Sequence, residues 1–217
     1  MKSIKNKLSE IKSKIDEKVT VVAVSKTKPI DDILKLYEDG HFDFGENKVQ
    51  ELIVKNKELP KDIKWHMIGH LQRNKVKQII SFIYLIHSVD SIRVLNKIND
   101  EAKKINRKVN VLLQVKISEN DLKYGFDLNE VQNLLENDFL KKYDFVNVLG
   151  LMGMASFTQN KNIINDEFKA LNSIYSKFKK TYNFTTLSIG MSGDYELALK
   201  NNSNMLRLGS IIFGHRS

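Results

Sequence analysis

The chain has 217 residues, 41% of them hydrophobic, which predicts a single folded domain over residues 1–217 and excludes a disordered chain. It contains no cysteine, so disulfides and thiolate metal sites are excluded, and we expect a reducing, cytoplasmic compartment. The formal net charge of +9 would suit a nucleic-acid-binding protein, but the basic residues are mostly lysines spread along every predicted helix, so we expect no nucleic-acid partner.

The chain has no run of about 18 apolar residues, so we expect no membrane partner, and it opens with an amphipathic segment that lacks the apolar core of a secretory signal. This segment predicts a helix with Ile4, Leu8, Ile11 and Ile15 on one face. Segments rich in valine, isoleucine and aromatic residues then predict eight strands, at residues 19–25, 41–45, 63–69, 82–89, 109–117, 145–152, 184–191 and 205–212.

The segments between these strands have helical periodicity, most clearly after the fifth and sixth strands. The first of these helices carries the stripe Leu128, Val131, Leu134, Leu135 and Leu140. The second carries Ile164, Phe168, Leu171, Ile174, Tyr175 and Phe178. Several strands are almost continuously apolar, which is typical of a parallel sheet covered by helices.

Eight strand–helix units predict an α/β fold, a single (β/α)8 TIM barrel with an extra N-terminal helix. An open Rossmann sheet is the alternative, but no G-x-G-x-x-G follows any predicted strand. In such barrels the chemistry lies at the carboxyl ends of the strands, and phosphate groups favour the loops after strands seven and eight. The residues that follow each strand are therefore the candidates for function.

The first predicted strand is followed directly by Lys26. At the mouth of a barrel its amine would be partly desolvated, so its pKa would fall and the neutral amine could form an imine with an aldehyde. The alternative is an ordinary solvated loop lysine. Lys28 is a rival for the same role, but it precedes Pro29 and the start of a predicted helix, so we expect it to point to solvent.

The ends of the second and third strands carry Asn47 and His70. Asn47 suits either a contact to a polar ligand or an N-cap of the next helix. His70 lies past its strand, where a ligand contact is expected, whereas His66 lies inside the strand and suits a structural role. The two histidines do not have the helical H-E-x-x-H spacing, so the sequence predicts no metal site.

The last two strands end in turns rich in glycine and serine. Ser192 and Gly193 precede a predicted helix, and Gly209 and Ser210 follow the eighth strand. Two such turns predict a phosphate cradle, because backbone N–H groups at a helix start favour anions. Arg207 lies inside an apolar strand and needs acceptors for its hydrogen bonds, which a ligand or a structural carboxylate would provide.

Six segments in order resemble the YggS/PROSC family, the pyridoxal 5′-phosphate homeostasis proteins, and the resemblance covers essentially the whole chain. They are VVAVSKTKP (21–29), FGENKVQE (44–51), WHMIGHLQRNK (65–75), GLMGMA (150–155), LSIGMSGDYELAL (187–199) and MLRLGSIIFG (205–214). The fold that this resemblance implies is a barrel related to the N-terminal domain of alanine racemase. It agrees with the count of strands.

The resemblance implies a pyridoxal 5′-phosphate cofactor held as a Schiff base on Lys26, with Arg207 facing the pyridine nitrogen. The binding residues that it implies are Lys26, Asn47, Met67, Gly69, His70, Met152, Ser192, Gly193, Arg207, Gly209 and Ser210. The sequence departs from the family pattern at Arg73, where serine is common, and at Gly193, where the family has an acidic or polar residue. Residues 202–204 replace a Gly-Ser-Thr run, which leaves a phosphate contact at Asn204 in doubt.

The resemblance also implies a carrier of the cofactor rather than an enzyme, and an arginine at the pyridine nitrogen agrees with this, because it would weaken the cofactor as an electron sink. Because the sequence runs only to Ser217, we expect no counterpart of the extra domain that supplies the tyrosine of alanine racemases. We expect a monomer that buffers pyridoxal phosphate and delivers it to apo-enzymes. The alternatives are a weak amino-acid racemase or lyase and a nucleic-acid-binding protein.

Overall fold

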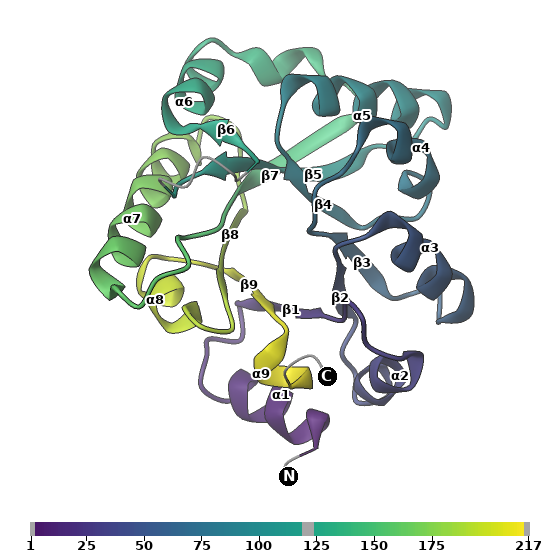
Figure 1. Cartoon of the computed structure of the whole chain (residues 1–217). Coiled ribbons are helices and arrows are strands. Elements are labelled where there is room, and N and C mark those ends of the chain that lie inside the picture. Colours follow the sequence, from purple (N-terminus) through teal and green to yellow (C-terminus); the bar gives the residue numbers. More distant parts are fainter. Residues whose placement is uncertain (1–2, 119–123, 215–217) are drawn as a thin grey trace.

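A computed structural model describes residues 3–118 and 124–214, so a prediction that rests on the chain end at Ser217 lies outside the described residues. Eight parallel strands close into a barrel with helices on its outside (Figure 1). These strands are β1 (Thr20–Val24), β2 (Asp43–Glu46), β3 (Lys64–Met67), β4 (Leu85–Val89), β5 (Val109–Lys116), β7 (Val146–Gly153), β8 (Thr186–Met191) and β9 (Met205–Leu208). Pairing of β4 with β5 and of β1 with β9 closes the ring, and the two-residue strand β6 (Phe126–Asp127) lies alongside β5.

The helices follow the strands around the ring. They are α1 (Ile4–Lys12), α2 (Ile30–Glu38), α3 (Val49–Glu58), α4 (Val76–Ile79), α5 (Ile92–Lys104), α6 (Leu128–Glu136), α7 (Lys161–Phe178), α8 (Tyr195–Lys200) and α9 (Ser210–Phe213), with 3-10 turns η1 (Arg73–Lys75) and η2 (Phe139–Lys142). In the described part of the chain, none of them is both long and apolar enough to cross a bilayer.

The predicted (β/α)8 barrel and its extra N-terminal helix are confirmed, with differences at the element ends. The eighth predicted strand is wrong beyond Leu208, because residues 210–213 form α9. A short apolar run does not distinguish a strand from a helix by its periodicity. The first helix ends at Lys12, so Ile15 packs on the core from the turn that follows. Strand β6 was not predicted.

Alternation along the strands separates two apolar regions, because successive side chains of a strand point to opposite faces. The larger region fills the space between the sheet and the helices, and it includes the apolar stripe of α7. The smaller region is a distinct cluster formed by Val22, Leu85, Leu112, Met152 and Met205, one residue from each of five strands. Side chains therefore fill the barrel interior, and the space for a ligand is left at one end of it.

Candidate functional site

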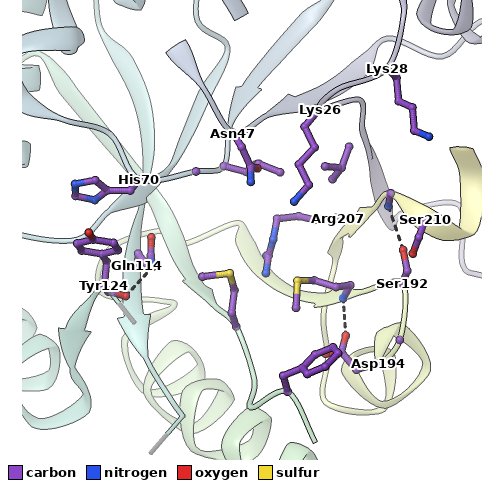
Figure 2. A pocket seen from close by; sticks show the side chains of 18 of the residues that line it. Lys26, Lys28, Asn47, His70, Gln114, Tyr124, Ser192, Asp194, Arg207 and Ser210 are labelled. Carbon is purple, nitrogen blue, oxygen red and sulfur yellow. Dashed lines mark hydrogen bonds between the residues drawn. The ribbon is translucent and has the colours of Figure 1, made fainter. Parts of the chain in front are cut away.

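A cavity of about 810 Å³ opens at the carboxyl ends of the strands, where the fold predicts chemistry. Nine of the residues predicted for the site line it: Lys26, Asn47, Gly69, His70, Ser192, Gly193, Arg207, Gly209 and Ser210. They come from five different strand ends and surround one space (Figure 2). The residues that the sequence separated by up to 184 positions are thus neighbours in the structure.

Lys26 follows the end of β1, is half-buried and projects into the cavity (Figure 2). The next residue, Thr27, has a positive φ of 64°, and its N–H donates to Glu51 Oε1 at 2.6 Å. The expectation that Lys28 points to solvent is wrong. Lys28 is half-buried at the rim of the cavity, and its Nζ donates to the Phe213 carbonyl at 3.4 Å.

A buried ion cluster holds the turn that carries Lys26. Lys55 is only 4% exposed, and its Nζ donates to the Ser25 carbonyl at 2.8 Å and to Oε1 of Glu46 and of Glu51 at 2.7 Å each. Burial raises the pKa of Glu46, while Lys55 and the Ser25 hydroxyl act in the opposite direction. The backbone on both sides of Lys26 is therefore tied to this cluster.

The ends of β2 and β3 pack against each other at the cavity through Asn47 and Gly69. A Cβ atom at Gly69 would lie 2.3 Å from the Asn47 carbonyl oxygen, so only glycine allows this close approach. The interpretation of Asn47 as an N-cap is wrong, because helix α3 has Lys48 at its N-cap position. Asn47 instead lines the cavity.

His70 forms one wall of the cavity together with Tyr124. The two rings are stacked, with 3.9 Å between their centroids, and His70 Nδ1 lies 2.8 Å from Asp90 Oδ2. Gln114 Nε2 donates to the Tyr124 carbonyl at 2.7 Å. These contacts hold His70 at the rim, with its side chain 37% exposed.

The turns after β8 and β9 meet opposite Lys26 (Figure 2). Ser192 Oγ accepts hydrogen bonds from the backbone N–H groups of Gly209 at 3.1 Å and Ile211 at 3.4 Å. A Cβ atom added at Gly193 would meet nothing within 4 Å. Backbone donors, a hydroxyl and an open glycine thus converge, which is the arrangement that the sequence predicts for a phosphate.

Arg207 lies in β9 at the floor of the cavity and is 4% exposed. Its Nη1 donates to the Ser188 carbonyl at 2.7 Å and to Ser188 Oγ at 2.6 Å, and its Nη2 donates to the Gly153 carbonyl at 2.8 Å. Carbonyls and a hydroxyl thus replace the structural carboxylate that was the alternative. Burial lowers the pKa of Arg207 to about 10, so the guanidinium stays charged near pH 7.

Two predicted residues do not line the cavity. Met67 is fully buried in the outer core, and Ile68, which points the other way, lines the cavity instead. Met152 belongs to the inner apolar cluster, and Met154 lines the cavity in its place. The doubt about Asn204 is resolved: it precedes β9, at the opposite end from the cavity, and its side chain pairs with the β8 backbone.

Sequence reasoning missed several lining residues, among them Gln114, Tyr124, Met154, Phe157 and Asp194. A lone amide inside an apolar strand was a usable signal for Gln114. Tyr124 and Phe157 lie in loops without any motif. Among the described residues, no group of three or more His, Asp or Glu side chains could hold a metal ion.

The arrangement suits one class of ligand. An amine enters the cavity on one side, backbone donors converge on the other, and a buried guanidinium lies between them. A compound with a carbonyl group and a phosphate would meet the amine with the first and the backbone donors with the second. Arg207 uses three of its five N–H donors in the hydrogen bonds above, so its guanidinium retains donor capacity toward the cavity.

Residues 1–217 match the family described as "Alanine racemase, N-terminal domain". The pyridoxal phosphate homeostasis protein of Synechocystis is 34% identical over 211 residues, which cover 96% of each chain. The human pyridoxal phosphate homeostasis protein is 34% identical over 210 residues, which cover 90% of this chain and 76% of the human one.

Solved structures also resemble this chain. PipY of Synechococcus elongatus, determined with pyridoxal phosphate bound, is 30% identical, with a TM-score of 0.88 over 98% of this chain and 100% of PipY. An alanine racemase of Clostridium difficile is 17% identical, with a TM-score of 0.83 over 99% of this chain and 60% of the racemase. The likeness to the racemase concerns the fold alone.

Proposed function

Because this chain belongs to the alanine racemase N-terminal domain family, and within it to the pyridoxal phosphate homeostasis proteins, we propose that it binds pyridoxal 5′-phosphate in the cavity described above, through Lys26. The observation that carries the proposal is the convergence of Lys26, Arg207 and the turn at Ser192 on one cavity. Its role is the homeostasis of the cofactor, which includes buffering its concentration.

The residues present fit the cofactor. Lys26 supplies the amine for covalent attachment, and its turn is held by the buried cluster at Lys55. The N–H groups of Gly209 and Ile211 donate to Ser192 Oγ in this structure, and we propose that the same groups serve as donors for a phosphate. His70 and Tyr124 form the wall of the cavity on the side of β3. The cavity of about 810 Å³ is large enough for a ligand of this size.

The position of Arg207 favours a carrier of the cofactor over an enzyme that uses it for catalysis. Pyridoxal phosphate, when bound, can draw electrons from an attached substrate, most strongly when its ring nitrogen is protonated. Arg207 stays charged and can only donate, so it would hold that nitrogen as an acceptor. We therefore propose that the protein has no substantial turnover, and that it acts as a cytoplasmic monomer delivering its cofactor to apo-enzymes.

Equilibrium titration of the protein with pyridoxal phosphate, followed by absorbance, tests this function. We expect saturable binding of one cofactor per chain, and much weaker binding of pyridoxal, which lacks the phosphate. Equal affinity for the two compounds would contradict the proposed phosphate site. An absence of binding to either would contradict the function.

The alternative of a weak racemase or lyase has its own test. The cofactor-loaded protein is incubated at length with L- and D-amino acids, and the products are separated by chiral chromatography. We expect no inversion above that of free pyridoxal phosphate. Inversion that disappears in Lys26→Ala would favour the enzyme.

A further inference from the structure

A continuous series of buried hydrogen bonds crosses the barrel interior from the start of β2 to Arg207. His66 Nε2 lies 3.1 Å from Asp43 Oδ1, and His66 Nδ1 lies 2.9 Å from His87 Nε2. His87 Nδ1 lies 3.1 Å from Ser188 Oγ, which accepts from Arg207 Nη1 at 2.6 Å. We refer to these five residues as the interior hydrogen-bond series.

The series joins the two ends of the barrel. Asp43 begins β2, at the end away from the cavity, and its side chain is 19% exposed. His66 and His87 are completely buried in β3 and β4. Ser188 lies across the barrel in β8, next to Arg207 at the cavity floor. His66, which we predicted to have a structural role, is therefore one member of a longer series of hydrogen bonds.

The chemistry of the two ends fixes the direction of every bond between them. An ionised Asp43 can only accept, so His66 carries its proton on Nε2 and accepts on Nδ1. His87 then donates from Nε2 and accepts on Nδ1, which leaves the Ser188 hydroxyl as the donor to His87. Ser188 Oγ is consequently an acceptor for Arg207, which can only donate.

The electrostatics of the interior agree with this assignment. Burial lowers the pKa of His66, and it lowers that of His87 well below the usual value, with the charge of Arg207 acting in the same direction. Burial also opposes ionisation of Asp43, but the His66 hydrogen bond and the nearby Lys64 outweigh it and lower the pKa of Asp43. Both histidines are therefore neutral between a cation and an anion.

We propose that the interior hydrogen-bond series positions Arg207 for its contact with the cofactor. Asp43, His66, His87 and Ser188 act as positioning residues, because their fixed direction of donation commits one Nη1 N–H of Arg207 to the series and so sets the orientation of the guanidinium toward the cavity. This inference rests on the proposed function, since the contact that it serves is the one to the cofactor's ring nitrogen.

Histidine-ring NMR of the full-length protein without cofactor tests the series directly. We expect His66 and His87 to be neutral at pH 7, each with its proton on Nε2, and His66→Gln and His87→Gln assign the signals by their loss. A proton on Nδ1 of either ring, or a charged ring, would overturn the assigned direction and with it the proposal.

Cofactor binding tests the consequence for Arg207. Ser188→Ala is compared with Ser203→Ala, since Ser203 is also buried and its hydroxyl donates to the Ile189 carbonyl of β8 at 2.6 Å, without touching the series. We expect Ser188→Ala to weaken pyridoxal phosphate binding on the order of tenfold and to shift the absorbance maximum of the bound cofactor. The control should retain both values.

A second pair of variants changes the far end, where folding is less at risk. Asp43→Asn removes the accepting charge, and Asp62→Asn removes a carboxylate near the same end that instead accepts from the Tyr37 hydroxyl. We expect Asp43→Asn to weaken binding on the order of twofold and to shift the absorbance in the same direction as Ser188→Ala. If both test variants match their controls while the unmodified protein binds the cofactor, the positioning role is wrong and the proposed function stands.

Discussion

The two sides of the cavity are built in different ways. On the side of β1 to β4, buried ionisable groups fix the structure: Lys55 with Glu46 beneath the Lys26 turn, and the histidines of the interior hydrogen-bond series. On the side of β8 and β9, backbone N–H groups, small hydroxyls and glycines surround the opening, while the buried Arg207 lies at the cavity floor between the two sides. We call the β1–β4 side, which carries Lys26, the amine side, and the β8–β9 side, which carries the turns at Ser192 and Gly209, the anion side. Buried charges fix the structure of the amine side, and the path of the backbone fixes that of the anion side.

This difference teaches which changes each side can tolerate. A buried charge that loses its partner is costly, whereas a backbone donor is present whatever the side chain. The stability of the amine side should therefore fall strongly when a charge is removed or the pH is lowered. The anion side should be sensitive mainly to substitutions that change its shape. The predictions below test this contrast, beginning with the largest effect.

Lys55→Ala should be the most damaging, because it leaves the carboxylate of Glu46 buried without its cation. We expect the free energy of unfolding to fall by about 3–5 kcal/mol, as measured by urea denaturation. Covalent attachment at Lys26 should also be reduced, since Ser25 loses its contact to Lys55. The exposed Lys57 on the same helix supplies the control Lys57→Ala. A loss no larger than that of the control would refute the role of the buried cluster.

Acid should loosen the β1–β4 side first. Burial lowers the pKa of His41 to about 4, and it also lowers those of His66 and His87. The unfolded chain binds protons at these positions below about pH 6.5 while the folded chain does not, so each histidine removes about 1.4 kcal/mol of stability per pH unit until its folded pKa is reached. Between pH 7 and pH 5, the protection factors from hydrogen exchange, which correct for the slower intrinsic exchange in acid, should fall in β2–β4 before they fall in β8 and β9. A uniform fall would contradict the contrast.

Gly69→Ala and Gly193→Ala compare shape on the two sides. The added methyl at residue 69 meets the Asn47 carbonyl oxygen at 2.3 Å, and that at residue 193 meets nothing. We expect Gly69→Ala to cost about 1–3 kcal/mol of stability in urea denaturation. Gly193→Ala should leave stability unchanged and still weaken cofactor binding, because the methyl would enter the proposed phosphate space. Normal cofactor affinity in Gly193→Ala would remove residue 193 from the site.

Ser192→Ala should have only a small effect on folding. Its hydroxyl accepts from the N–H groups of Gly209 and Ile211, which water can reach once the hydroxyl is absent. We expect a loss of about 0.5–1.5 kcal/mol in thermal or urea unfolding, with Ser210→Ala as the control on the neighbouring turn. A loss as large as that of Lys55→Ala would mean that side-chain contacts, and not the backbone, hold the anion side.

The sequence predicts the features that are local to one strand end. Lys26, Asn47 and Arg207 each follow or interrupt an apolar strand, and each lines the cavity. Features that need two distant segments escaped prediction. Neither Lys55 nor the pairing of His66 with His87 has a local pattern, because each depends on closure of the barrel. The prediction that Met67 lines the cavity was off by one residue, because successive side chains of a strand face opposite sides and Ile68 lines the cavity instead.

The central claim, that the Lys26 amine holds the cofactor covalently, is tested most directly by borohydride reduction of the pyridoxal phosphate complex followed by tandem mass spectrometry. We predict a single reduced adduct on Lys26, its loss in Lys26→Ala, and its retention in Lys28→Ala. An adduct on Lys28 or on surface lysines in the unmodified protein would contradict the account.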